Sequence, residues 1–141
     1  MNLYTTNTQI HAIVVYCSEL DLQPPMSKFL EEQLPELLNV TADEFRYLPL
    51  VVPGGPAYYN LAFMTDAIER LYDISNTTSI VLIMHAGCRF APGEEGQEYL
   101  TSRLAMECLP GTWANVRTVL LEPGGDEFVV AEYVHPQDMD D

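Results

Sequence analysis

The chain has 141 residues, of which 21 are acidic and 6 are basic, so its formal net charge at pH 7 is −15. This excess of acidic side chains disfavours binding to nucleic acids and to anionic membranes, because both require basic side chains that neutralise phosphate. The length predicts a single domain over residues 1–141, and no apolar run approaches the ~18 residues that a membrane span requires.

Short apolar segments alternate with helical patterns along the chain. Residues 10–17 (IHAIVVYC) form a continuous run rich in Val and Ile, which is typical of a strand buried on both faces of a parallel sheet. A helical pattern follows over residues 26–38, and Pro35 inside it should end or kink the helix. A second strand is predicted over residues 47–52, closed by a turn at residues 53–56 (PGGP).

The alternation continues in the second half of the chain. A helix capped by Asn60 is predicted over residues 60–72, and a strand over residues 80–84 leads directly to His85 and Cys88. A helix over residues 94–109, a strand over 117–121 and a last strand over 128–134 complete the pattern. This order predicts an α/β fold, a three-layer sandwich with a mostly parallel central sheet and an antiparallel last strand.

Side chains that bind metal ions lie at the ends of two predicted strands. Cys17 ends the first strand, and His85 and Cys88 follow the third. Ligand sites of open α/β sheets form beyond the carboxyl ends of strands, where the strand order reverses. Two thiolates and one imidazole favour zinc over magnesium or calcium and leave a fourth position open, as in catalytic zinc sites. The alternative is that both cysteines only fill the core, as we expect for Cys108 in its apolar helical stretch.

A strand ending in Cys17, a second strand ending in a glycine-rich turn and a third ending in H-x-x-C resemble the β-class carbonic anhydrases. The resemblance covers about residues 10–93, and the matching segments read VVYCSELD, LPLVVPGGP and IMHAGC. It implies that Cys17, His85 and Cys88 bind Zn²⁺, and that a zinc-bound hydroxide converts carbon dioxide to bicarbonate. It also implies a homodimer and a fold like that of the family.

The chain departs from the family in the residues around the metal. The family's first motif is C-x-D-x-R, whereas this chain has Glu19 in the Asp position and Asp21 in the Arg position. Asp21 adds negative charge where bicarbonate would form, which disfavours that product. Glu19 is the candidate for orienting the zinc-bound water or for binding zinc and closing the site. Arg89, beside Cys88, is the candidate for replacing the missing cation; for both residues the alternative is an ordinary solvated side chain.

Two functions remain open from the sequence. The first is a zinc lyase that acts on carbon dioxide, bicarbonate or a similar small molecule. The second is a non-catalytic zinc-binding module with a structural or sensory metal and a protein partner. We favour the first, because nothing in the sequence points to a macromolecular partner. The amino terminus shows no secretory signal and the odd number of cysteines favours reduced thiols, so we expect a cytoplasmic protein.

Overall fold

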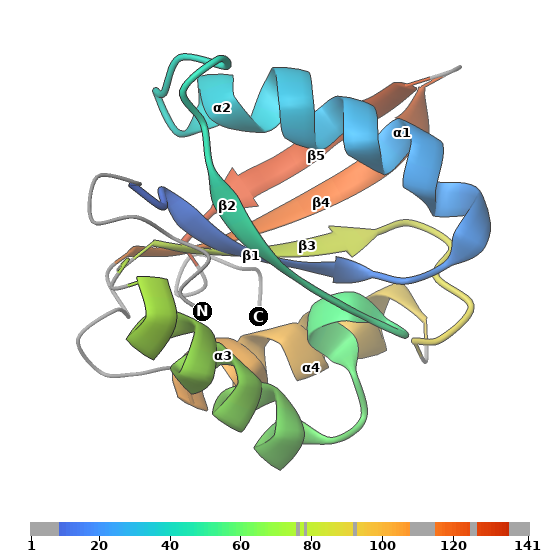
Figure 1. The fold of residues 1–141 in the computed structure, drawn as a ribbon. Coiled ribbons are helices and arrows are strands. Elements are labelled where there is room, and N and C mark those ends of the chain that lie inside the picture. Colours follow the sequence, from blue (N-terminus) through green and yellow to red (C-terminus); the bar gives the residue numbers. More distant parts are fainter. Residues whose placement is uncertain are drawn as a thin grey trace.

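The computed structural model describes residues 9–75, 77, 79–91, 93–107, 115–124 and 127–135, and it has a central sheet with helices on both faces (Figure 1). Within these residues five strands lie in the order β2-β1-β3-β4-β5. The first four strands are parallel, and β5 is antiparallel to β4. The predicted fold class is therefore confirmed, including the antiparallel last strand. The strands are β1 (Ala12–Cys17), β2 (Tyr47–Val52), β3 (Ile80–His85), β4 (Val116–Gly124) and β5 (Glu127–Val134).

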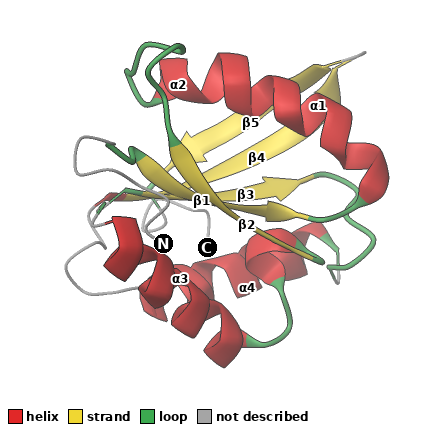
Figure 2. Ribbon diagram, viewed as in Figure 1, coloured by secondary structure: helices red, strands yellow, loops and turns green. Residues whose placement is uncertain are grey.

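Helices form a layer on each face of the sheet, as Figure 2 shows in red against the yellow strands. No helix in the described ranges is long and apolar enough to cross a membrane. The predicted helix over residues 94–109 is seen as far as Glu107, and Cys108 lies outside the described residues. One layer holds α1 (Gln23–Lys28), a π-helical turn η2 (Phe29–Gln33) and α2 (Leu34–Leu37); the other holds α3 (Leu61–Ser75) and α4 (Glu94–Glu107).

Two apolar cores lie between the sheet and these helical layers, one on each face of the sheet. Successive side chains of a strand point to opposite faces. Ala12 and Val14 accordingly pack in one cluster with Phe29 of the first helical layer. Ile13 and Val15 pack in a second cluster with Met64, Ile68 and Leu104 of the other layer. Burying each large aliphatic side chain contributes about 1.5–3 kcal/mol, so both faces of the sheet hold the strand ends in place.

The first helical layer differs from the sequence prediction at its start and contains a π-helical turn near Pro35, where an end or a kink was predicted. The helix begins at Gln23, three residues before the predicted start, because Pro24 and Pro25 fit its first turn, where a missing N–H costs no hydrogen bond. Pro35 does not end the helix at once. The π-helical turn before it widens the backbone, with the Leu34 N–H donating to the Phe29 carbonyl, and the helix continues to Leu37.

Strands β1 and β3 stop pairing with each other before either strand ends. Among the described residues, β1 and β3 pair only where residues 13–15 lie beside residues 80–82. By contrast, β1 pairs with β2 as far as Cys17, and β3 pairs with β4 as far as His85. The strand order reverses between β1 and β3, which is where ligand sites form in open α/β sheets.

Candidate metal centre

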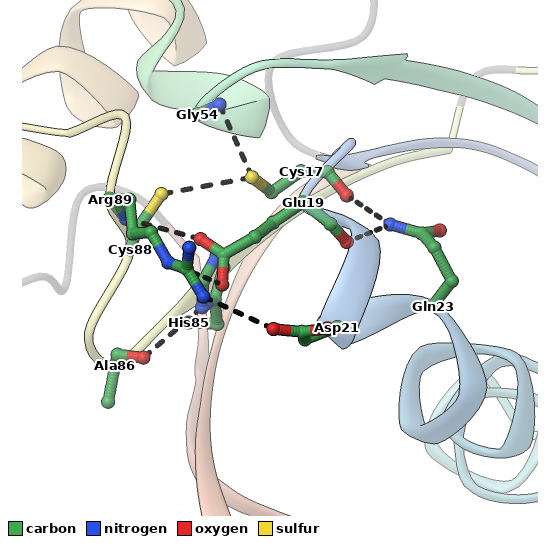
Figure 3. Close-up of polar contacts among 9 residues, drawn as sticks. All are labelled: Cys17, Glu19, Asp21, Gln23, Gly54, His85, Ala86, Cys88 and Arg89. Carbon is green, nitrogen blue, oxygen red and sulfur yellow. Dashed lines mark hydrogen bonds and ion pairs between the residues drawn. The ribbon is translucent and has the colours of Figure 1, made fainter.

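The carboxyl ends of β1 and β3 bring together four side chains that bind metal ions. Cys17, Glu19, His85 and Cys88 each offer one ligand atom, and these atoms all lie within 4.8 Å of one another. Figure 3 shows the group with its neighbours. The structure thus places the three ligands proposed from the sequence beside one another, together with Glu19. The group is able to hold a metal ion; the assignment of each residue as a ligand stays a prediction.

The distance between the two sulfur atoms can be compared with the distances found in zinc sites and in disulfides. Cys17 Sγ lies 3.8 Å from Cys88 Sγ. Thiolates that bind one zinc ion at about 2.3 Å with tetrahedral geometry lie about 3.8 Å from each other. A disulfide requires a separation of about 2.05 Å. The two cysteines therefore stand at a spacing that thiolates sharing a metal ion would have, and that an S–H···S hydrogen bond between two thiols also has.

The glycine-rich turn after β2 packs directly on Cys17. The Gly54 N–H donates a hydrogen bond of 3.3 Å to Cys17 Sγ. Gly55 has φ +57°, and a Cβ on it would lie 2.9 Å from the Cys17 nitrogen. Only glycine fits so close to that strand end in this backbone conformation. The PGGP segment therefore does more than reverse the chain, since it holds the backbone and the sulfur of Cys17.

His85 has the surroundings of a metal-binding imidazole. Its side chain ends β3, and the residue is 3% exposed. Nδ1 lies 3.2 Å from the Ala86 carbonyl oxygen, and the buried Nε2 has no hydrogen-bond partner among the residues that the structure describes. With the proton on Nδ1 donated to that carbonyl, the lone pair of Nε2 is left for a metal ion. A buried polar atom without a partner is costly, and a bound cation would satisfy it.

Glu19 and Arg89 contact each other across two loops. The backbone N–H of Arg89 donates to Glu19 Oε1 at 3.3 Å, and Arg89 Nε lies 3.7 Å from Glu19 Oε2. Arg89 Nη2 also donates to Asp21 Oδ2 at 3.2 Å. The Glu19 side chain is 15% exposed, while those of Arg89 and Asp21 are 69% and 79% exposed. The Arg89–Asp21 pair is exposed and adds at most about 1 kcal/mol.

The pKa values show how negative charge is shared in the group. Burial opposes ionisation of Cys17, but the neighbouring His85 imidazole and the backbone N–H groups beside the sulfur lower its pKa below the ordinary value. Burial also acts to lower the pKa of His85, but the neighbouring Cys17 raises it overall. Burial and the charge of Cys17 raise the pKa of Cys88 to about 11. A second thiolate is therefore unfavourable until a cation neutralises the first, which is what a divalent metal ion does.

Two glutamines that the sequence reasoning missed bind the backbone of the group. Gln23 Nε2 donates to the carbonyl oxygens of Cys17 and Glu19, at 3.1 Å and 2.6 Å. Gln97, on α4, makes two hydrogen bonds to the backbone of His85. The only sequence signal for Gln97 is that a polar residue stands at an inward position of a helix. Gln23 carries no such signal.

His11 lies away from this group. It precedes β1, at the opposite end of that strand from Cys17. Its Nδ1 accepts a hydrogen bond from the Arg46 N–H, and its ring stacks on Phe45.

Comparison of the sequence with protein-family models finds no match, and comparison with curated proteins finds none either. The resemblance noted above therefore rests on the motifs of this chain.

Proposed function

We propose that the protein binds one zinc ion through Cys17, His85 and Cys88, and that it hydrates carbon dioxide weakly, as a divergent relative of the β-class carbonic anhydrases. The observation that carries the zinc site is the convergence of the ligand atoms, with the two sulfurs 3.8 Å apart. Soft thiolates with an imidazole select zinc over the hard cations magnesium and calcium. The unpartnered Nε2 of His85 supports the same choice.

A zinc ion in this group would supply the Lewis acidity that activates water for attack on carbon dioxide. The chain's own residues would orient the water molecule and balance the charge of the site. Glu19 offers a carboxylate beside the ligand atoms, where it can accept a hydrogen bond from water. Arg89 holds that carboxylate from the loop after β3. In the family an Arg in the first loop holds the corresponding carboxylate, and here Arg89 would take that role.

The charges of the site argue for a low rate. Two thiolates cancel the charge of Zn²⁺, and Arg89 has both Glu19 and Asp21 beside it. The site is then left with a net negative charge and without a free cation among these groups to stabilise a forming bicarbonate. Loss of one such preorganised group costs ~10²–10³ in rate. We therefore expect activity well below that of a fully equipped site.

The zinc site is tested by metal analysis of the wild-type protein, Cys88→Ser and the control Cys108→Ser. We expect about one zinc per chain in the wild type and in Cys108→Ser, and loss of most zinc in Cys88→Ser, because two remaining ligands bind zinc poorly. Stopped-flow measurement of carbon dioxide hydration on the same samples should show activity only where zinc is retained. Full retention of zinc by Cys88→Ser would contradict this ligand set.

A second candidate is a non-catalytic zinc module in which Glu19 is the fourth ligand. The specific observation is that the Glu19 carboxylate belongs to the same group of ligand atoms and is mostly buried. Four protein ligands are typical of structural zinc sites. Such a site would have no position left for water.

Glu19→Ala and Glu19→Gln separate the two candidates. If Glu19 orients water, Glu19→Ala lowers the hydration rate ~10²-fold while zinc is retained. If Glu19 closes the site, Glu19→Ala raises the rate from a negligible level and weakens zinc binding. Glu19→Gln keeps the length of the side chain but removes its charge, so it serves as the matched variant. Vigorous hydration that neither variant alters would show that Glu19 has neither role.

A further inference from the structure

The backbone of His85 faces a gap in the strand pairing. The Ala86 N–H donates to the Leu121 carbonyl on the β4 side of β3. Backbone groups of successive strand residues point to opposite edges, so the N–H and C=O of His85 point toward β1. The pairing of β1 with β3 ends earlier, at Leu82. Two buried backbone groups of a proposed metal ligand thus have no strand to pair with in the described part of the chain.

Gln97 supplies the missing partner from α4. Its Oε1 accepts a hydrogen bond of 3.0 Å from the His85 N–H, and its Nε2 donates one of 3.0 Å to the His85 carbonyl. Gln97 is 2% exposed. A side-chain amide has the same donor and acceptor as a peptide group, so Gln97 continues the hydrogen-bonding pattern of the sheet where β1 has turned away.

We propose that Gln97 is the positioning residue of the metal centre, which fixes the backbone of His85 and the start of the loop that carries Cys88. This inference rests on the proposed zinc site. His85 is the last residue of β3, and Gly87, with φ +73°, bends the chain between the two ligands. If the backbone at His85 is free to move, both the imidazole and the Cys88 thiolate lose their fixed separation from Cys17.

The hydrogen bond between the end of β3 and β4 does not provide this restraint alone. The hydrogen bond from Ala86 to β4 restrains one edge of the strand, and the Gln97 amide restrains the other. A buried backbone group that is left without a hydrogen-bond partner destabilises the fold. Without Gln97, the end of β3 would therefore be stabilised by shifting to a position where these backbone groups find other hydrogen-bond partners. Removal of groups that hold metal ligands in place typically weakens metal binding 10–100-fold.

The experiment compares Gln97→Met with Thr101→Val. Methionine has the length of glutamine but cannot make the two hydrogen bonds. Thr101 lies one turn further along α4, is 0% exposed, and its hydroxyl has no hydrogen-bond partner in the described structure, so Thr101→Val controls for a change in helix packing. The readouts are zinc affinity by competition with a chromophoric chelator, the absorption spectrum of the cobalt(II)-substituted protein, and the denaturation midpoint of the metal-free protein.

We expect Gln97→Met to bind zinc 10–100-fold more weakly and to shift the cobalt d–d bands, and Thr101→Val to bind within about threefold of the wild type with an unchanged spectrum. Gln97→Asn, which keeps the amide but is one methylene shorter, provides a milder variant if Gln97→Met does not fold, and an intermediate loss is expected. If the wild type binds zinc and the folded Gln97 variants keep its zinc affinity and its cobalt spectrum, this inference alone is overturned. A wild-type protein that binds no zinc would overturn the proposed function as well.

Discussion

At the scale of single residues, the arrangement of the two thiols has consequences with and without a metal ion. Cys17 and Cys88 are held 3.8 Å apart by separate backbone elements, one at the end of β1 and one in the loop after β3. Metal binding would keep both sulfurs as ligands. Without metal, a small movement brings them to bonding distance.

We expect the metal-free protein to form a Cys17–Cys88 disulfide when treated with diamide, with the two thiols losing two hydrogen atoms to the reagent. Zinc should protect the thiols, because thiolates bound to a metal are less available to attack. Peptide mapping by mass spectrometry of metal-free and zinc-loaded samples provides the measurement. A disulfide that involves Cys108 instead, at equal rates with and without zinc, would be the opposite result.

At the scale of elements, the candidate site depends on the turn after β2 as much as on the strands and the loop that carry the candidate ligands. The turn and the 3₁₀ segment η3 (Gly55–Ala57) bring a glycine backbone against the end of β1, and Gly54 binds the Cys17 sulfur. A contact this close leaves no room for a side chain. The stability of the fold and the position of Cys17 are therefore coupled at Gly55.

We expect Gly55→Ala to destabilise the protein by about 3–4 kcal/mol, since the left-handed conformation costs about 1–2 kcal/mol and the added methyl overpacks the end of β1. Gly87→Ala is the matched control, because Gly87 also has positive φ but a Cβ there meets nothing within 4 Å. It should lose only about 1–2 kcal/mol. Urea denaturation of the metal-free variants measures both values, and equal losses would show that the contact with Cys17 contributes nothing.

At the scale of the whole molecule, charge and exposed apolar surface act in opposite directions. The net charge of −15 opposes close approach of two copies. The helical layer opposite α1 exposes several large apolar side chains, which favour association. These are Phe63 and Ile74 of α3 and Tyr99 and Met106 of α4.

The resemblance to the β-class carbonic anhydrases leads us to propose a homodimer, and the charge predicts that its assembly depends on salt. Light scattering at ~0.01 M and ~0.5 M sodium chloride should show a larger dimer fraction at high salt, where the Debye length falls from about 30 Å to a few ångströms. Phe63→Glu, in the exposed apolar layer, should reduce that fraction, and Val129→Glu on the exposed face of β5 is the control. A monomer at high micromolar concentration under both conditions would contradict the dimer.

The sequence determined the fold class and the meeting of the three candidate ligands. Hydrophobic runs and helical patterns are local, so each strand could be recognised from its own residues. Parallel strands place their carboxyl ends at one edge of a sheet, so Cys17, His85 and Cys88 could be expected together from their positions alone. The PGGP turn was visible as a turn for the same reason.

Only the tertiary structure decided which groups support those ligands. The contact of Arg89 with Glu19 joins residues 70 positions apart, and it depends on how two loops pack. The pairing of Gln97 with His85 depends on where β1 and β3 stop pairing, which no single segment encodes. The first helix also continues past Pro35, through the π-helical turn that precedes it. Local pattern thus fixes the elements, whereas the register between distant elements decides which polar groups meet.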